Sequence, residues 1–230
     1  MKTVKTRALW IILSINLIMT AAAMNFLPDE IPLHYDLEGI VDRTGSKYEM
    51  FVLTGLAAAF VVFWELFVRV YIRKSRRAKD EKTAEDTMTN AKIILYAGAF
   101  QTGIQTLIQL IFVFAAFGGG AEAASPSEWI YTVLCAACGA GQIFLGNYIP
   151  KTKRGGSVGL RTTWSVKNDM IWAKSNRFAG VMMCASGVAA IAEGFVLKGI
   201  ASVFAMLGAL AAAAAASTVY SYILYRQDAA

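Results

Sequence analysis

The sequence is poor in the residues that build metal and catalytic sites. It has a single histidine, His34, and three cysteines among 230 residues. A lone histidine with no cysteine near it argues against a zinc site and against the nucleophile–histidine pairs of hydrolases. The odd number of cysteines, all within apolar stretches, implies no disulfide framework. We therefore expect no metal, no cofactor and no enzymatic activity.

Polar stretches long enough to form a separate soluble domain are also missing. Apolar residues make up 57% of the chain and gather in runs of the length that crosses a bilayer. The runs lie near residues 8–27, 50–72, 93–117, 128–149, 178–197 and 199–225. The sequence therefore predicts an all-α integral membrane protein with six transmembrane helices, forming one domain over residues 1–230.

The first run has a second interpretation. A basic start, an apolar stretch and the sequence Thr20-Ala21-Ala22-Ala23 also describe a cleavable secretory signal. The apolar run continues to Leu27, however, which is long enough for a complete span. We therefore expect a retained helix.

Lys and Arg residues are scarce in every second loop between the apolar runs, that is, on one side of the membrane. With a cytoplasmic amino terminus, the inner segments hold nineteen Lys and Arg residues, and the outer loops hold three. This positive-inside bias predicts that both termini lie in the cytoplasm. It also explains the net charge of +6 without nucleic-acid binding, which we do not expect.

The first outer loop, from Leu27 to Glu49, is expected to have a defined shape. Pro28 and Pro32 prevent a regular helix, and Gly39 and Gly45 provide turn positions. The loop is acidic. Its histidine, His34, is expected to form hydrogen bonds within the loop rather than bind a metal.

Polar side chains inside the apolar runs allow two interpretations. The i,i+4 spacing of Glu65 and Arg69 predicts an interfacial ion pair, and a stripe of glutamines, Gln101, Gln105 and Gln109, favours hydrogen bonding between helices. The alternative is a transporter or intramembrane enzyme that uses a polar path. That path would consist of Glu65, Gln101, Gln105, Gln109, Gln142 and Glu193.

The fourth run contains a Cys-x-x-Cys sequence, Cys135 to Cys138, that superficially matches a redox pair. In an apolar helix these residues are better explained as small buried side chains. Gly139, Gly141 and Gly146 predict close helix contacts, as does the alanine run of the last span.

The long polar segment from Gly146 to Gly180 carries seven Lys and Arg residues and one acid, Asp169. Three glycines, Gly155, Gly156 and Gly159, allow unusual backbone conformations there. The apolar residues of 165–178 form no single helical stripe. A helix in that stretch is therefore expected to pack against protein rather than lie on the membrane.

Two stretches have positions that match a known pattern. In GNYIPKTKRGGSVGLRTTWSVKNDMIWAKSNRFAG they are Gly146, Asn147, Pro150, Lys151, Gly159, Arg161, Thr162, Trp164, Trp172, Arg177 and Gly180. In LPDEIPLHYDLEGIVDR they are Leu27, Pro28, Asp29, Pro32, His34, Gly39 and Asp42. The first stretch resembles the signature of the SdpI family of bacterial membrane immunity proteins. The second is similar to the short domain of unknown function that often precedes it. Thr163 and Asn176 depart from the family, which often has proline and histidine there.

The resemblance implies a multi-pass protein of the bacterial plasma membrane that protects the cell from a secreted toxin peptide. It also implies a receptor that holds a small transcriptional repressor at the membrane. The matched positions of the outer loop would then sense the toxin peptide, and those of the inner loop would bind the repressor. The alternative for either set is a purely structural role. The expected regions are a helix–loop–helix over 8–60 and the SdpI signature over 128–197. A third possibility is that the basic loop only binds anionic lipid.

Overall fold

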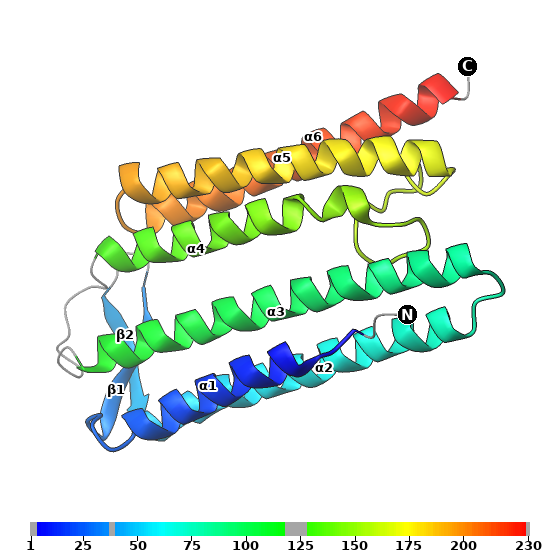
Figure 1. Cartoon of the computed structure of the whole chain (residues 1–230). Coiled ribbons are helices and arrows are strands. Elements are labelled where there is room, and N and C mark those ends of the chain that lie inside the picture. The colour runs from blue at the N-terminus through cyan, green and yellow to red at the C-terminus, as the bar shows by residue number, and fades with distance from the viewer. Residues whose placement is uncertain (1–3, 37–39, 118–127, 229–230) are drawn as a thin grey trace.

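The structure, a computed structural model, describes residues 4–36, 40–117 and 128–228. Within these ranges the chain forms six α-helices and one β-hairpin (Figure 1). The helices are α1 Arg7–Ala23, α2 Met50–Arg76, α3 Glu81–Phe117, α4 Glu128–Gly146, α5 Asp169–Val196 and α6 Ile200–Asp228. Two short 3-10 helices, η1 Lys47–Glu49 and η3 Ile149–Lys151, precede α2 and follow α4. The mostly helical membrane fold is therefore confirmed.

Five helices in the described ranges are long and apolar enough to cross a membrane, namely α2 to α6. The apolar helix α1 is shorter, with 17 residues, and ends at Ala23 rather than at the expected Leu27. The N–H groups of Phe26 and Leu27 both donate to the Ala23 carbonyl, which closes the helix with a turn. Pro28 explains the early end, because a residue that precedes proline avoids the helical conformation.

The first loop forms an antiparallel hairpin, which the sequence did not predict. Strand β1 Glu30–Tyr35 pairs with β2 Val41–Ser46. Gly45, expected at a turn, instead lies inside β2 opposite Ile31. A Cβ atom at Gly45 would overlap the ends of the Glu49 and Leu33 side chains, so a larger residue there would displace these two side chains. Gly39 lies outside the described residues.

The hairpin is fixed to the end of the first helices by a small apolar core. Leu27 and Ile31 are buried there against Met50 of α2 and Val113 of α3. The loop therefore has the defined shape that its prolines predict.

Side-chain caps explain why α3 and α5 begin before the apolar runs. Asp80 accepts a hydrogen bond from the Thr83 N–H at 2.8 Å, and Asn168 accepts one from the Ile171 N–H at 2.8 Å. Such caps satisfy backbone donors that a helix start leaves free. The polar linker after α2 is therefore mostly helical, and 169–177 is the first part of α5.

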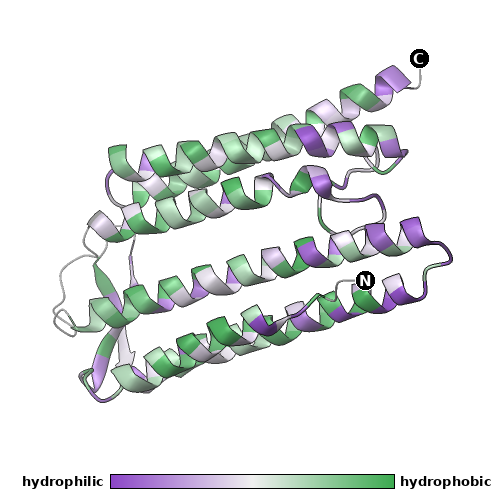
Figure 2. Ribbon diagram, viewed as in Figure 1, coloured by the Kyte–Doolittle hydropathy of each residue, from purple (hydrophilic) through white to green (hydrophobic). Residues whose placement is uncertain are grey.

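The helices form two groups of three. Helices α1, α2 and α3 pack on one another, as do α4, α5 and α6, and the groups meet along α3 and α4 (Figure 1). Figure 2 shows apolar residues along the middle of the bundle and hydrophilic ones towards its ends. We call these the hairpin end, which carries β1 and β2, and the basic end, which carries the α2–α3 turn, the α4–α5 connection and the end of α6.

Helices α4 and α5 approach closely through glycines, as predicted. A Cβ atom at Gly187 would lie 2.5 Å from the Gly139 carbonyl oxygen, and one at Gly180 would lie 2.6 Å from that of Gly146. No side chain larger than hydrogen fits between the two backbones at these points. Gly141 accommodates the ring of Phe100 from α3.

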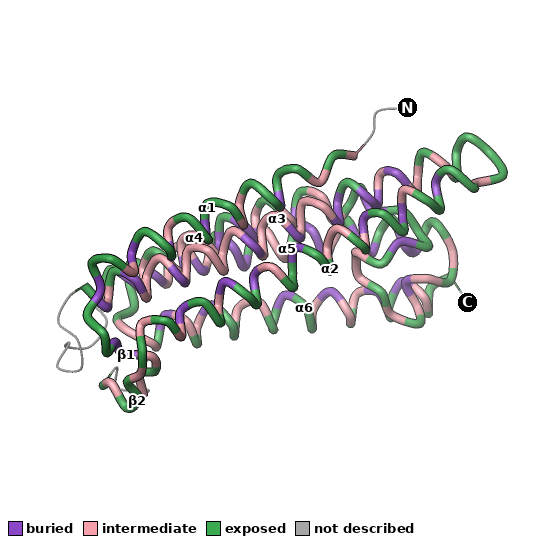
Figure 3. The backbone as a smooth tube through the Cα atoms, turned by 90° about the horizontal axis from the view of Figure 1, so that it is seen from below, coloured by how far each residue is buried: buried purple, intermediate pink, exposed green. Residues whose placement is uncertain are grey.

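The glutamine stripe bonds helices together in the first group. Gln109 is fully buried and donates to Thr20 of α1 and Thr54 of α2, and it accepts from Asn16 of α1 at 3.1 Å. Figure 3 shows buried positions along the faces where the helices meet. Interhelical adhesion, the favoured interpretation of the stripe, is what these bonds produce.

Candidate functional site

The candidate site is the basic segment, which we define as residues 147–168, between α4 and α5. Gly146, the last residue of α4, meets Gly180 of α5. Since Asp169 precedes Gly180 by eleven residues, α5 continues for about 16 Å past the end of α4. The basic segment packs on this part of α5, which extends beyond α4. Pro150 packs directly on Gly180, so the turn after α4 is fixed by sterics.

Asn176 is the central residue of this contact. It is fully buried, and its Oδ1 accepts a hydrogen bond from the Leu160 N–H at 2.7 Å. Its Nδ2 donates to the Trp172 carbonyl at 2.9 Å. Gly159 has a φ of +121°, and a Cβ atom there would lie 2.6 Å from Asn176 Oδ1. The indole N–H of Trp172, 3% exposed, donates to the Thr152 carbonyl at 2.9 Å.

A reciprocal turn follows. The Thr162 N–H donates to Ser165 Oγ at 2.9 Å, and the Ser165 N–H donates to Thr162 Oγ1 at the same distance. The fully buried Ser165 hydroxyl donates to the Leu160 carbonyl, and the Thr162 hydroxyl contacts Ser221 of α6 at 2.9 Å. The rings of Trp164 and Tyr222 pack edge to face. The basic segment is therefore attached to α6 as well as to α5.

The basic segment also joins the two helix groups. Asn90 of α3, 3% exposed, accepts from the Lys153 N–H at 2.9 Å and donates to the Lys153 carbonyl at 3.2 Å. Asp86 lies 3.4 Å from Lys153 Nζ. Tyr71 of α2 shares a hydrogen bond of 2.6 Å with Ser157. These contacts fix the segment to α2 and α3.

The predicted positions in the basic segment and the start of α5 are of two kinds. Some belong to the packing just described, which we call the framework: Pro150, Gly159, Thr162, Trp164 and Trp172. Asn147 donates to the Ile143 carbonyl at the end of α4. The surface positions are charged. Lys151 lies 4.4 Å from the Tyr148 ring centre, Arg161 donates to the Gly156 carbonyl at 2.7 Å, and Arg177 is exposed.

Several residues of the framework were not predicted from the sequence. They are Tyr71, Asn90, Thr152, Ser165 and Ser221. The three-residue spacing of Thr162 and Ser165 is a local signal that could have been used. Asn90 and Ser221 have no such signal, because their partners are distant in the chain.

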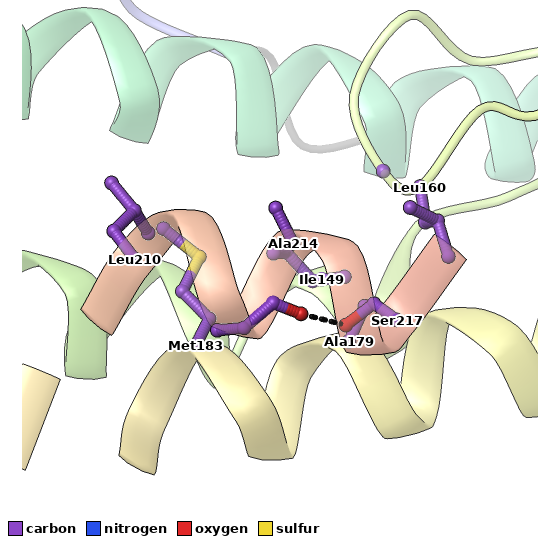
Figure 4. A pocket seen from close by; sticks show the side chains of 9 residues that line it. Ile149, Leu160, Ala179, Met183, Leu210, Ala214 and Ser217 are labelled. Atoms are coloured by element: carbon purple, nitrogen blue, oxygen red, sulfur yellow. Dashed lines mark hydrogen bonds between the residues drawn. The ribbon is translucent and has the colours of Figure 1, made fainter. Parts of the chain in front are cut away.

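An apolar cavity lies beside this framework. It has a volume of about 210 Å³ and is lined by Ile149, Gly159, Leu160, Ala179, Met183, Leu210, Ala213, Ala214 and Ser217. Figure 4 shows these side chains, with the Ser217 hydroxyl bonded to the Ala213 carbonyl. The cavity thus offers an apolar lining rather than a polar site.

At the hairpin end, three of the predicted positions form polar contacts across the loop. His34 Nδ1 lies 2.6 Å from Asp42, confirming that the histidine bonds within the loop, and Lys47 Nζ lies 3.1 Å from Asp29. Pro28 lies two residues before the start of β1, and Pro32 is buried within this strand. Burial raises the pKa of the Tyr35 hydroxyl, with a smaller effect from Tyr131 of α4.

The two ends of the bundle carry side chains of opposite net charge. The described hairpin residues between Asp29 and Glu49 carry five acidic and two basic side chains, whereas the basic segment carries five Lys and Arg residues and no acid. One end can attract cations and the other anions. No group of His, Cys, Asp or Glu that could hold a metal occurs among the described residues.

A mostly helical bundle with five membrane-length helices and polar ends defines a multi-pass membrane protein. Residues 151–221 match the model of the SdpI/YfhL protein family, and residues 11–58 match that of a domain of unknown function (DUF1648). The resemblance to the SdpI family is thereby confirmed, and with it a bacterial membrane location. Searches of curated proteins and of solved structures found no significant match.

Proposed function

We propose that this protein is an immunity protein that protects a bacterium from a secreted antimicrobial peptide. We further propose that it signals the presence of the peptide by holding a small cytoplasmic repressor at the basic end. The single observation that carries this proposal is the separation of the two family regions, with the hairpin at one end of the bundle and the basic segment at the other (Figure 1).

The hairpin suits a ligand that is cationic and partly apolar. Glu30 and Asp36 form no ion pair within the described chain, so their charge is available to a ligand. Beneath the hairpin lies a cavity of about 330 Å³ with a mostly apolar lining, and the ion pair of Arg43 with Glu49 completes it. Its apolar residues are Leu33, Met50, Val52, Leu53 and Phe112. Acidic side chains beside an apolar cavity complement an amphipathic peptide.

A continuous series of contacts links this cavity to the basic segment. Gln109 donates to the Met50 carbonyl and Gln105 to the Leu53 carbonyl, both belonging to residues that line the cavity. Gln105 accepts from Gln101, which accepts from the Trp64 indole at 3.0 Å.

The series continues in aromatic side chains. Trp64 packs on Phe67, and Phe67 packs edge to face on Tyr71 with ring centres 5.6 Å apart. Tyr71 bonds Ser157 of the basic segment. A ligand that shifts the start of α2 would therefore have a route of packed side chains to the basic segment, which is one way in which coupling between distant sites is carried.

The exposed cations of the basic end can bind an acidic surface of the repressor. Arg161, Lys167, Lys174 and Arg177 are all exposed. A planar guanidinium such as that of Arg161 can bind a carboxylate with two hydrogen bonds, whereas lysine provides a point charge. This difference separates protein binding from simple attraction to anionic lipid.

The glutamines argue against the transporter alternative. Their side-chain amides bond to neighbouring helices, and Gln142 of α4 accepts from Ser186 of α5. Amides used for helix adhesion do not provide a free polar path. Solute flux in reconstituted vesicles that disappears in a Gln105→Leu variant would instead support the transporter alternative.

The experiment is expression of the protein in a strain that is sensitive to a related peptide. Wild-type protein is expected to increase survival and to retain the repressor in the membrane fraction. Arg161→Ala and Arg161→Lys are expected to release the repressor while the protein stays inserted and survival persists. Unchanged survival against every related peptide would refute the immunity role, and equal retention by all three forms would refute the role of Arg161.

A further inference from the structure

The function proposed above assigns no role to a groove along α1. Its volume is about 620 Å³. We call it the α1 groove, and its lining consists of Thr6, Arg7, Trp10, Ile11, Ser14, Ile15, Ile18 and Glu65. The α1 positions recur every three or four residues, so they form one face of the helix.

The groove has a charged start and an apolar length. Arg7 and Trp10 lie at the start, which belongs to the basic end of the bundle, and Ile11, Ile15 and Ile18 follow. These three isoleucines are 59%, 55% and 68% exposed. Ile18 lies seven residues after Ile11, a rise of about 10 Å, and one leaflet is about half of a hydrocarbon core of about 30 Å. The apolar part of the groove therefore fits within one leaflet.

The charge at the start of the groove is positive, although a carboxylate lines it. Glu65 accepts hydrogen bonds from Trp10 Nε1 at 2.6 Å and from Arg69 Nη2 at 2.6 Å, and from Thr6. Arg69 therefore compensates the carboxylate. Within the described part of the chain Arg7 has no ion pair, and its side chain is exposed. One guanidinium remains available to an anion.

We propose that the α1 groove binds one anionic phospholipid of the leaflet at the basic end. Its phosphate is held by Arg7, with Trp10 at the level of the headgroups, and one acyl chain lies along Ile11, Ile15 and Ile18. Basic pockets beside transmembrane helices bind anionic headgroups in this way, and tryptophan prefers the interface. The bound lipid lies beside both α1 and α2, because Glu65 of α2 belongs to the lining of the groove.

The test uses purified full-length protein in detergent micelles, with native mass spectrometry to count retained lipid. The probes are dioleoyl phosphatidylglycerol and dioleoyl phosphatidylcholine at equal concentration. Wild-type protein is expected to retain one phosphatidylglycerol in preference to phosphatidylcholine. Arg7→Gln is expected to weaken this binding about five-fold, as loss of one basic residue near a lipid surface predicts. Lys5→Gln, the matched control, removes an exposed charge that does not line the groove and should leave it unchanged.

Two further measurements separate binding of the acyl chain in the groove from binding of the headgroup alone. Ser14→Trp fills the groove without changing charge and is expected to release the lipid, and glycerol phosphate alone is expected not to compete. Equal effects of Arg7→Gln and Lys5→Gln, or retention of both lipids alike, would overturn the proposal. Competition by glycerol phosphate would overturn the role of the apolar groove, as would undiminished binding to Ser14→Trp.

Discussion

Asn176 accepts its hydrogen bond from the backbone of Leu160, so one buried amide on α5 fixes the path of the basic segment. Asn176→Ala removes this acceptor and leaves a buried N–H without a partner, which costs about 1–3 kcal/mol. We expect a lower thermal stability in detergent and faster amide exchange of residues 152–165. Asn147→Ala, at a more exposed amide, is the control and should behave like wild type. A wild-type exchange pattern in Asn176→Ala would show that the amide does not hold the segment.

The family often has histidine where this chain has Asn176, and the difference predicts a pH effect. A neutral imidazole nitrogen can accept the Leu160 hydrogen bond, but a protonated one cannot. Asn176→His should therefore resemble wild type at pH 8 and lose stability as the pH falls below about 6.5. Melting temperatures of both proteins between pH 5 and 8 provide the measurement. Parallel curves would exclude an acceptor role for the imidazole.

The glycine contacts between α4 and α5 predict a steric effect. Gly187→Ala would place a methyl group 2.5 Å from the Gly139 carbonyl oxygen and should separate the two helices. We expect destabilisation of about 1–3 kcal/mol, typical of overpacking. Gly208→Ala of α6 is the control, because nothing lies within 4 Å of its Cβ position. Equal melting temperatures for the two variants would mean that α4 and α5 do not pack as described.

Gln109 provides the test of the buried hydrogen bonds among α1, α2 and α3. Gln109→Leu removes its bonds to Thr20 and Thr54 and leaves Asn16 without its amide partner. Its cost should be about 1–2 kcal/mol, the upper range for hydrogen bonds within membranes. Gln227→Leu changes an exposed residue at the end of α6 and serves as the control. Unfolding in denaturing detergent would compare them, and a neutral Gln109→Leu would contradict the adhesive role.

The cap of α3 predicts a response to acid. The Thr83 backbone N–H, and then the Thr83 hydroxyl, lower the pKa of Asp80 below its ordinary value. Because the folded pKa is lowered, the stabilisation is complete above the ordinary value and is lost as the pH falls through the lowered one. The protection factors of amides at the start of α3, which are exchange rates corrected for their intrinsic pH dependence, should therefore fall at acid pH. Asp80→Asn retains a cap without titration, so its protection factors should not show this fall.

The charge bias predicts the membrane orientation, which can be measured directly. A cysteine replacing Lys167, which is exposed, should react with impermeant reagents only from the cytoplasm. A cysteine replacing Asp36 of the hairpin end should react only from outside. The reverse pattern would invert the whole assignment of ligand and partner sides.

Sequence reasoning succeeded where the signal was local and periodic. Apolar runs predicted the helices, and the spacings of Glu65 with Arg69 and of the three glutamines predicted their contacts. It failed for the hairpin, because two prolines and scattered acids hide the strand pattern. It also treated Asn176 only as a departure from the family. The burial of that amide depends on Leu160 and Gly159, which reach it through the fold rather than through spacing.

The division into two groups of three helices gives the chain a modular character. One family match falls in each group, and the described polar contacts between the groups include the pairing of Asn90 with the Lys153 backbone. A chimera that exchanges residues 1–117 between relatives should therefore assemble when the incoming segment keeps the side chains that contact the second group, namely Tyr71, Asp86, Asn90 and Phe100. Natural recombination could diversify the module that carries the hairpin by the same route, without disturbing the module that carries the basic segment.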